Sequence, residues 1–421
     1  MKPAYTSSNS FNDILKETQT AIHIALDKLG YTAEMFELLK EPLRTLTVKI
    51  PVKMDDGSIR FFTGFRAQHN DAIGPTKGGI RFHPNLTVEE VKAHSVLMGV
   101  RAGIIDVPYG GGSGGIICDP RQLSYAEIER LSRGYVRAIS QIVGPNKDIP
   151  SPDTQANVQM MSWMMDEYSK LDEFHSPAFI TGKPRSLGGT YGRETAVAKG
   201  VFYCIQKAAE NINLKLEGAK VIVQGFGRVG GYVAKSLREA GASIIAVSDA
   251  HGALYDAQGL DIDYLLDRRD SFGSVTNLFE SKLTDVQMLK LPCDILVTAA
   301  LDNQINEDNA YDIQAKIVAE VARNAVTLDG TSILFNNNIL LIPNILASSG
   351  ELALSYFEWV QNRQGYYWTK NEIDERLQKV MTHAFQDVFQ ISKTRQVHMR
   401  MAAYMTGVRK IAEACRFRGW V

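Results

Sequence analysis

Residues 220–231 read KVIVQGFGRVGG, an apolar run followed by a glycine-rich turn. The apolar run predicts a buried strand. The turn, Gly225 to Gly230, has the pattern G-x-G-x-x-G, and residues 228–240 after it have helical character. A further predicted strand, 243–247, leads to Asp249 about twenty residues later. This succession predicts a doubly wound parallel sheet of the Rossmann type, with the turn as its dinucleotide site.

Each glycine of the turn has a physical reason in a dinucleotide site. Gly225 makes the tight turn, Gly227 lets the backbone approach a pyrophosphate, and Gly230 allows the helix to pack closely on the strand. A Rossmann-type fold that binds no cofactor is the alternative interpretation. The residues expected to contact a dinucleotide here are Gly225, Phe226, Gly227, Arg228, Val229 and Gly230.

The acid at the end of the second strand indicates which dinucleotide is bound. Asp249 is expected to accept a hydrogen bond from the adenosine ribose, and its charge would repel a 2′-phosphate. NAD is therefore the expected cofactor. Arg228 and His251 lie close by in the sequence and leave NADP open.

A second glycine-rich stretch, Gly74 to Pro120, dominates the N-terminal half of the chain. It reads GPTKGGIRFHPNLTVEEVKAHSVLMGVRAGIIDVPYGGGSGGIICDP. Its two glycine clusters, 77–79 and 110–115, are interpreted as turns, with a helix at 88–105 between them. Such glycine density indicates backbone packed against a ligand or another chain segment. A surface linker is the alternative, but the flanking isoleucines argue for burial.

The remaining elements follow from local patterns. Apolar spacing predicts helix in residues 11–40, and Asp55-Asp56-Gly57 predicts a hairpin between strands at 46–52 and 59–66. Ser124 and Glu127 form a capping-box pattern. Residues 150–153, with two prolines, are expected to form a rigid loop. The Met-rich helix at 158–168 is expected in the core or in a subunit interface.

Composition narrows the functional classes. The chain has 421 residues, enough for two or three domains, and a formal net charge of −1, which gives no reason to expect nucleic acid as a partner. The start lacks the pattern of a secretory signal, and no apolar run is long enough to cross a bilayer. The four cysteines show no metal-ligand spacing. We therefore expect a cytoplasmic protein with no metal site and no membrane contact.

Several motifs together resemble the glutamate/leucine/phenylalanine/valine dehydrogenases, especially the bacterial NAD-dependent glutamate dehydrogenases. Besides the two glycine-rich stretches, the resemblance rests on DIPSPDTQANVQ (148–159), FITGKP (179–184), SDAHGALYD (248–256) and SYFEWVQN (355–362). It implies an α/β chain of two domains acting on an amino acid or 2-oxo acid. Residues 1–185 would form a substrate and assembly domain, with 350–421 packing back on it, and 186–349 a Rossmann domain. The resemblance also implies a homo-oligomer, commonly a hexamer.

The resemblance assigns roles to residues of the first domain. Lys77 falls on the lysine that contacts the side-chain carboxylate of glutamate, Ser355 on the serine that assists it, and Asp153 on the aspartate that shuttles a proton to the amino group. Two positions depart from the pattern. Arg101 stands where the family has the lysine for the α-carboxylate, and Ser113 replaces the catalytic lysine.

Both Lys77 and Asp153 also have plainer interpretations. Lys77 would otherwise be a solvated surface lysine, and Asp153 a helix N-cap. Serine has no charge and no basicity at neutral pH without an activating partner. Loss of a general acid–base group costs about 10²–10⁴-fold in rate.

Three further departures lie near the expected site. Val197 removes a hydroxyl beside the nicotinamide, Arg323 stands where an asparagine usually meets the cofactor, and Glu351 adds a carboxylate near the pocket mouth. A carboxylate there would repel an amino-acid substrate unless Arg101 or Arg323 pairs with it.

These departures leave three hypotheses. The first is an NAD-dependent oxidoreductase of altered substrate or chemistry, with weak or redirected glutamate deamination. The second is a non-catalytic homologue that regulates or co-assembles with an active dehydrogenase. The third, an ordinary glutamate dehydrogenase that tolerates serine, fits the chemistry least.

Overall fold

The computed structural model describes residues 9–270, 274–279 and 282–421. The first eight residues, which belong to the segment expected not to be a secretory signal, lie outside the described residues. The chain divides into two compact units, which are described separately. The first unit comprises residues 1–193, 352–373 and 404–421, and the second comprises 194–351 and 374–403.

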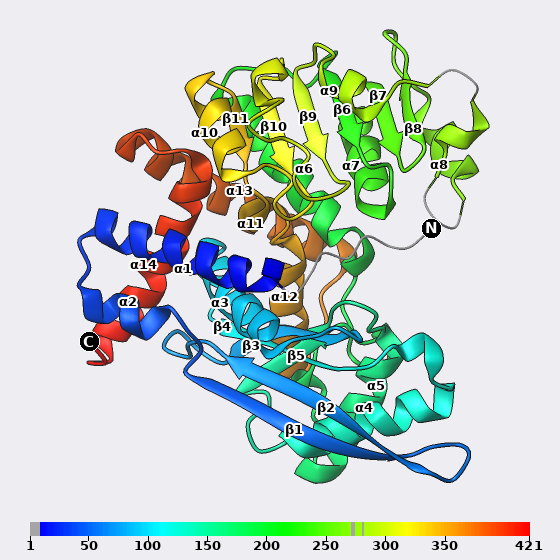
Figure 1. Cartoon of the computed structure of the whole chain (residues 1–421), viewed down its shortest axis with the longest axis vertical. Coiled ribbons are helices and arrows are strands. Elements are labelled where there is room, and N and C mark those ends of the chain that lie inside the picture. The colour runs from blue at the N-terminus through cyan, green and yellow to red at the C-terminus, as the bar shows by residue number, and fades with distance from the viewer. Residues whose placement is uncertain (1–8, 271–273, 280–281) are drawn as a thin grey trace. The chain divides into compact units, whose positions relative to one another are not determined.

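The first unit is built on a five-stranded sheet with the strand order β1-β2-β4-β3-β5 (Figure 1). The expected hairpin is present, because β1 and β2 pair antiparallel and Gly57 turns between them with a φ of +87°. Strand β4 runs antiparallel to β2, and β3 runs parallel to both β4 and β5. The strands are β1 Arg44–Lys53, β2 Ile59–Gln68, β3 Thr76–Phe82, β4 Gly110–Ile116 and β5 Asp148–Pro152.

Three segments interpreted as turns or loops are strands. The glycine clusters lie inside β3 and β4, and the proline-containing segment 150–153 overlaps β5 at the sheet edge. Glycine is ordinarily unfavourable in a strand, so sequence patterns predict turns. Here the glycines are needed because other groups lie against the strand faces, and an edge strand tolerates proline.

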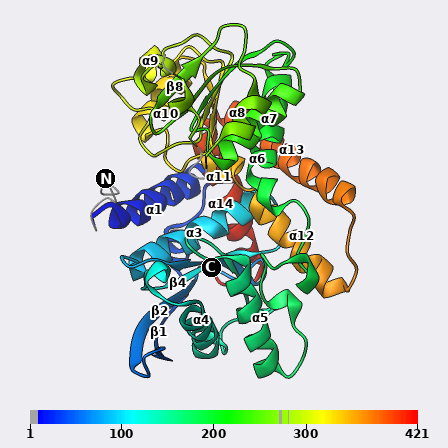
Figure 2. The ribbon, with the colours of Figure 1, turned by 90° about the vertical axis from the view of Figure 1, so that its right-hand side faces the viewer.

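Helices cover both faces of this sheet (Figure 2). Helix α3 (Val88–Ile104) packs against β4, and a Cβ on Gly99 would lie 2.8 Å from His69 Nδ1. Helices α4 (Tyr125–Ile139) and α5 (Val158–Asp172) pack together on the other face. The Met-rich helix is part of the core, because its four methionines are buried there: Met160, Met161, Met164 and Met165.

Capping side chains fix where two of these helices begin. The Thr87 hydroxyl accepts a hydrogen bond from the Glu90 amide at 3.1 Å, and α3 begins at Val88, directly after Thr87. Ser124 and Glu127 form the predicted capping box at the start of α4. The starts of α3 and α4 could therefore be predicted from the sequence.

The C-terminal helix α14 (Met399–Phe417) crosses α3 within the first unit at a glycine pair. A Cβ on Gly103 would lie 2.4 Å from the carbonyl oxygen of Gly407, so the two backbones touch. Near the chain end, the Arg418 Nε donates to the carbonyl of Ala72 at 2.7 Å. The first unit also contains α1 (Asn9–Leu29), α2 (Ala33–Leu39), most of α12 (Gly350–Gln364) and the first residues of α13 (Lys370–Arg395).

A buried histidine at the end of β2 gives the first unit a pH-dependent stability. His69 Nε2 lies 2.8 Å from the carbonyl oxygen of Leu39, and its Nδ1 has no partner among the described residues. Burial lowers the pKa of His69 to about 4. Between pH 6.5 and 4 the unfolded chain therefore binds more protons, and the free energy of unfolding falls as the pH falls.

We expect this group to contribute a loss on the order of 2–3 kcal/mol across that pH window. Denaturant midpoints measured from pH 7 to pH 4 should fall less steeply in His69→Gln, which keeps a donor toward Leu39. His175→Gln, at an exposed position, is the matched control and should follow the wild-type curve. Parallel curves for wild type and His69→Gln would contradict the assignment.

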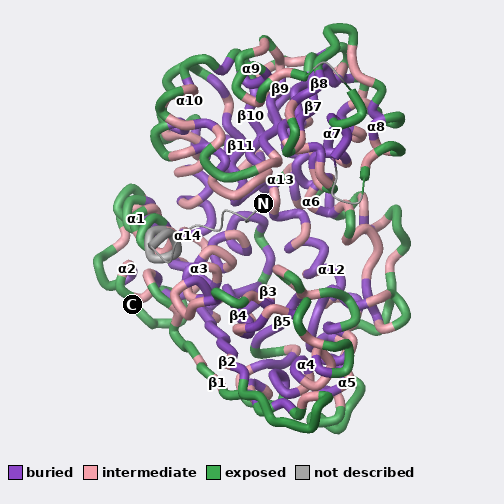
Figure 3. Tube along the Cα trace, turned by 45° about the vertical axis from the view of Figure 1, so that its right-hand side comes forward, coloured by how far each residue is buried: buried purple, intermediate pink, exposed green. Residues whose placement is uncertain are grey.

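The second unit is built on a six-stranded sheet with the order β11-β10-β9-β6-β7-β8. The central strands pair parallel, as expected for a doubly wound sheet, and are buried along most of their length (Figure 3). Strand β8 pairs antiparallel with β7 and was not anticipated. The strands are β6 Lys220–Gln224, β7 Ser243–Asp249, β8 Gly252–Tyr255, β9 Ile295–Thr298, β10 Ile317–Glu320 and β11 Leu340–Ile342.

Helices complete the second unit, and the expected α/β class with a Rossmann-like sheet is confirmed. One apolar cluster joins Ile222, Leu296 and Val318 of three neighbouring strands to Leu334 of α10. The helices are α6 Ala196–Asn211, α7 Arg228–Glu239, α8 Ile262–Arg268, α9 Asp285–Leu289, α10 Leu328–Asn336, α11 Asn344–Ala347 and α13 Lys370–Arg395.

The C-terminal helices differ from the expected division. We expected residues 350–421 to pack on the first unit, but 374–403, most of α13 among them, belong to the second. Two ion pairs hold this segment: Lys199 Nζ lies 2.5 Å from Asp374, and Arg400 lies 3.0 Å from the buried Glu320. Apolar periodicity shows that a helix has a buried face but does not show which neighbour covers that face.

Candidate functional site

Lys77, the expected substrate-binding lysine, lies on one face of β3. Lys77, Gly79 and Arg81 share a face of the strand, because side chains alternate along a strand. Lys77 is 1% exposed, so the interpretation of a solvated surface lysine is wrong. A cation this deeply buried requires compensation by anions or polar groups.

Asp153 lies on the same face, directly after β5. A Cβ on Gly79 would lie 2.5 Å from the Asp153 Cβ, so glycine is required where the carboxylate approaches the strand. Asp153 accepts from Arg81 Nε at 3.0 Å, and Arg81 also pairs with Glu90 of α3 at 2.6 Å. The helix-cap alternative for Asp153 is not what forms, because Asn157 caps α5.

Ser113 occupies the middle of β4, where it pairs with Ala67 of β2. It is 2% exposed, and on its own strand the nearest residues of the same face are Gly111 and Gly115. Among the described residues no partner hydrogen-bonds the Ser113 side chain. The hydroxyl therefore lacks the base that would make it a nucleophile or an acid–base group.

Ser355 and Arg101 complete the expected residues of the first unit. Ser355 is buried on α12, and its hydroxyl accepts a hydrogen bond from Arg193 at 3.2 Å. Arg101 is half-buried in the last turn of α3. Arg193 was missed from the sequence, since no local pattern distinguishes it from a surface arginine.

A buried ion pair, also missed, fixes the segment before Arg193. Lys183 Nζ lies 2.7 Å from the Glu358 carboxylate, and both side chains are fully buried. Glu358 also accepts from the backbone amides of Gly182 and Lys183. Burial lowers the pKa of Lys183, although the Glu358 charge opposes this. The pair ties the turn at 181–183 to α12, one turn from Ser355.

The glycine turn of the second unit has the geometry that a dinucleotide site requires. Gly225 has a φ of +90°, and a Cβ there would lie 2.7 Å from Ala299. A Cβ on Gly230 would lie 2.0 Å from the Gly225 carbonyl oxygen. A Cβ on Gly227 would meet nothing within 4 Å, and its φ of −69° suits any residue. The fold therefore needs Gly225 and Gly230, whereas the space at Gly227 is open.

The other residues of the turn follow this geometry. Phe226 is buried, Val229 is half-buried, and Arg228 is exposed at the first position of α7. Arg269, which the sequence did not single out, donates to the Gly227 carbonyl at 2.9 Å. The first amides of a helix have no acceptor within the helix and attract anions, so the turn and α7 fit a pyrophosphate.

The Asp249 carboxylate is hydrogen-bonded to residues of its own unit, whereas a contact with a ribose was expected. Its carboxylate accepts hydrogen bonds from the backbone amides of His251, Val275 and Thr276 and from the Thr276 hydroxyl at 2.5 Å. Ser274 donates a further one at 3.0 Å. Burial would raise the pKa of Asp249, but these hydrogen bonds outweigh it and lower the pKa. Five donors fill the acceptor capacity of a carboxylate, so Asp249 orders residues 274–276.

The remaining expected residues all lie in the second unit. Val197 is half-buried in the first turn of α6, Arg323 lies in a turn before Asn324, and Glu351 is half-buried at the start of α12. Arg101 belongs to the first unit. A pairing of Glu351 with Arg101 or Arg323, which would relieve its repulsion of the substrate, therefore stays a prediction.

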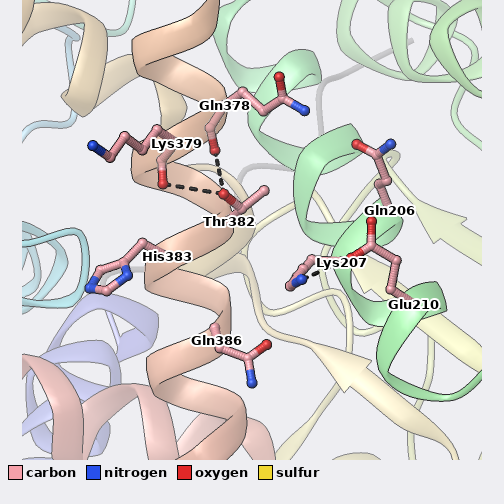
Figure 4. A pocket seen from close by; sticks show the side chains of 8 residues that line it. All are labelled: Gln206, Lys207, Glu210, Gln378, Lys379, Thr382, His383 and Gln386. Carbon is pink, nitrogen blue, oxygen red and sulfur yellow. Dashed lines mark hydrogen bonds and ion pairs between the residues drawn. The ribbon is translucent and has the colours of Figure 1, made fainter.

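A polar groove of about 350 Å³ between α6 and α13 is a separate feature (Figure 4). None of the expected site residues lines it. Its lining consists of Gln206, Lys207, Glu210, Gln378, Lys379, Thr382, His383 and Gln386. The lining lysine and glutamate of α6 pair with each other at 2.8 Å, so the groove has the character of two solvated helix faces.

The described part of the chain shows neither a metal-ligand cluster nor a membrane-spanning helix. No group of His, Cys, Asp and Glu there has the arrangement of a metal site. None of its helices combines the length and apolarity that a membrane crossing requires.

Comparison with known families matches nearly the whole chain. A family model described as Glutamate/Leucine/Phenylalanine/Valine dehydrogenase matches residues 188–419, and the Glu/Leu/Phe/Val dehydrogenase dimerisation domain matches residues 42–170. The chain belongs to the glutamate/leucine/phenylalanine/valine dehydrogenase family. The resemblance drawn from the motifs is thus confirmed for the family.

Individual members of the glutamate/leucine/phenylalanine/valine dehydrogenase family are similar to this chain over almost their full length. The cryptic catabolic NAD-specific glutamate dehydrogenase GudB of Bacillus subtilis is 61% identical over 412 residues, 97% of this chain and 96% of that protein. The glutamate dehydrogenase of Peptoniphilus asaccharolyticus is 40% identical with a TM-score of 0.89, covering 97% of this chain and all of that one. The hetero-hexameric glutamate dehydrogenase of Thermus thermophilus, in a Leu-bound form, is 33% identical with a TM-score of 0.89, covering 100% and 99%.

Proposed function

We propose that this chain is a glutamate-dehydrogenase-type, NAD-dependent oxidoreductase whose ordinary glutamate deamination is weak or redirected. The observation that carries the proposal is the composition of one face of the first sheet. Lys77, Arg81 and Asp153 are present there, while the strand position expected to hold the catalytic lysine has Ser113. The groups for binding a dicarboxylate and moving a proton remain, and the basic group is missing.

The chemistry explains why this loss matters. Oxidative deamination removes a hydride from the α-carbon, and water must then attack the imino carbon before ammonia leaves. The buried cation of Lys77 suits a side-chain carboxylate, and Asp153 can exchange a proton with the amino group. Activation of the water needs a base of near-neutral pKa. Ser113 supplies neither the base nor the positive charge that stabilises the oxygen of the adduct.

The residues of the second unit fit NAD. The bound nicotinamide would accept the hydride, while Gly225 to Gly230 and the start of α7 would hold the pyrophosphate. The relatives' NAD specificity supports the same cofactor. Because the Asp249 carboxylate is filled by residues 274–276, we infer that its charge disfavours NADP without a direct ribose contact.

A test of cofactor binding follows from the open space at Gly227. We expect Gly227→Ala to leave the free energy of unfolding within about 0.5 kcal/mol of wild type, because a Cβ there meets nothing. The added methyl should hinder a pyrophosphate lying against the turn and raise the Kd of NADH by about tenfold or more. NADH fluorescence titration and denaturant unfolding measure the two effects.

Gly230→Ala is the matched comparison, since its Cβ would clash with the Gly225 carbonyl. It should lower stability as well as affinity. Unchanged NADH affinity in Gly227→Ala would contradict a pyrophosphate at this turn.

A second candidate function is a non-catalytic subunit that co-assembles with an active dehydrogenase. Two observations favour it: the uncharged Ser113, and the similarity to a relative that is hetero-hexameric. We further propose that the chain forms oligomers, commonly hexamers in this family. The cytoplasmic location stays a prediction.

One experiment separates the two candidates. NADH binding is measured on the same sample as turnover of glutamate and of 2-oxoglutarate with ammonium, against a buffer control. Binding with slow turnover supports the weakened or redirected enzyme, and a screen of other 2-oxo acids follows. Absence of turnover with every 2-oxo acid, together with mixed oligomers in native mass spectrometry after refolding with an active homologue, would favour the co-assembling subunit.

A further inference from the structure

Arg66 has a fully buried side chain in the first unit that lies across the sheet without entering the expected substrate site. It projects from β2 on the face opposite Ser113, since the neighbouring Ala67 pairs with Ser113. Its guanidinium forms a two-point ion pair with Asp148, with Nε 2.7 Å from one carboxylate oxygen. Neither side chain is exposed. Gln68 donates to the same carboxylate at 3.0 Å.

The ion pair reaches across two intervening strands. Arg66 is on β2 and Asp148 begins β5, with β4 and β3 between them in the sheet. Glycine makes this crossing possible: a Cβ on Gly112 would lie 3.2 Å from the Arg66 guanidinium, and one on Gly114 would lie 2.9 Å from its Cδ. Gly112 and Gly114 of β4 therefore accommodate the Arg66 side chain on this face, independently of any ligand on the other.

The same guanidinium also holds the backbone beside Lys77. Strand β3 pairs with β4 at Thr76 and Lys77 and again at Ile80, but not at Gly78 and Gly79. Both residues pair with β5 on the other side, and Arg66 donates to their carbonyl oxygens at 3.3 and 3.2 Å. It thereby adds side-chain hydrogen bonds where the pairing between β3 and β4 is interrupted.

Strand β5 depends on the other half of the ion pair. It is five residues long, lies at the edge of the sheet and contains Pro150 and Pro152, which offer no amide for pairing. Asp148 at its start is fixed by Arg66 and Gln68, and Asp153 follows its last residue. The placement of Asp153 is therefore linked to the same guanidinium as the backbone after Lys77.

We infer that Arg66, paired with Asp148, is a positioning residue that sets Lys77 and Asp153 relative to each other for a dicarboxylate ligand. The inference rests on the proposed function for the identity of that ligand. Its structural part is that one buried guanidinium fixes β3 at Gly78–Gly79 and β5 at Asp148. The Asp148 charge and hydrogen bonds raise the pKa of Arg66 in spite of its burial, so the guanidinium stays charged.

The test compares Arg66→Lys with wild type in three measurements. Lysine keeps the charge but cannot make a two-point contact and reach both carbonyls. We expect the Kd of 2-oxoglutarate to rise about 10- to 100-fold, as small displacements of binding groups do, while the Kd of NADH stays within about twofold. Hydrogen exchange should become faster at residues 76–82 and 148–152, with residues 44–62 unchanged.

Arg44→Lys is the matched control, because Arg44, at the start of β1, also pairs with an aspartate, Asp71 after β2, but at a more exposed position. It should change none of the three measurements. If Arg66→Lys does not fold, Gln68→Met removes one donor to Asp148 and should give a smaller change in the same direction, strongest at 148–152.

The outcomes separate this inference from the proposed function. Failure of the wild-type protein to bind 2-oxoglutarate would overturn the proposed ligand, and the exchange pattern would still decide the role of Arg66. Unchanged exchange at 76–82 and 148–152 would overturn the positioning role. An even increase over all five strands would overturn it too, since it would show a merely structural contribution.

Discussion

Ser113→Lys is expected to raise glutamate turnover by at least about 10²-fold, the scale of one general acid–base group. The introduced side chain would project from β4 on the face where Lys77 and Asp153 lie. Its neighbours along the strand are glycines, which leave room for a longer side chain. Burial and a nearby cation would lower its pKa toward the range in which it can activate water. Steady-state kinetics with glutamate and NAD measure the effect.

The kinetic parameters and a matched control make this prediction specific. The KM for glutamate should change less than kcat, because Lys77 is already in place. Ser113→Met adds similar bulk without charge and should give no increase. A wild-type kcat typical of an active enzyme, or a gain below about tenfold in Ser113→Lys, would contradict the assigned role. In the latter case Ser113→Lys combined with Arg101→Lys would test whether Arg101 is also limiting.

Lys183→Met is expected to lower the free energy of unfolding of the first unit by about 3–5 kcal/mol. The substitution leaves the Glu358 carboxylate buried without its cation, where both side chains are fully buried. The amides of Gly182 and Lys183 would still donate to Glu358 and would compensate only part of the loss. Denaturant unfolding followed by tryptophan fluorescence measures the effect.

An exposed pair of the same unit provides the control for this prediction. Lys170 pairs with Asp166 at 2.8 Å, with both side chains largely exposed. Exposed pairs contribute little, so Lys170→Met should cost no more than about 0.5 kcal/mol. An equal loss of unfolding free energy in Lys170→Met and Lys183→Met would show that the Lys183–Glu358 pair stabilises the unit no more than an exposed pair does. Because the segment it fixes leads to Arg193 and Ser355, Lys183→Met should also weaken 2-oxoglutarate binding.

Local patterns determined a large part of this protein. The dinucleotide turn, its strand and its helix follow from residues 220–240, since tight turns and helix starts depend on neighbours in the chain. The capping box at Ser124 and Glu127 and the hairpin at Gly57 are equally local. Ser113 was also singled out before the structure, through the resemblance of its motif to the family.

Tertiary structure decided the features that depend on residues distant in sequence. Strand rather than turn at the glycine cluster 110–115 required Arg66, Asp148 and α3, which fill the space that side chains would take. At Gly78 and Gly79 the same space is taken by the backbone of β4 and by Asp153. Asp249 bonds to residues 274–276, and 374–403 pack on the second unit through Lys199 and Glu320. Glycine spacing indicates that another group lies close to the backbone, and apolar periodicity indicates that one face of an element is buried. Packing between distant segments decides which group lies there, so the pattern of one segment cannot identify that group.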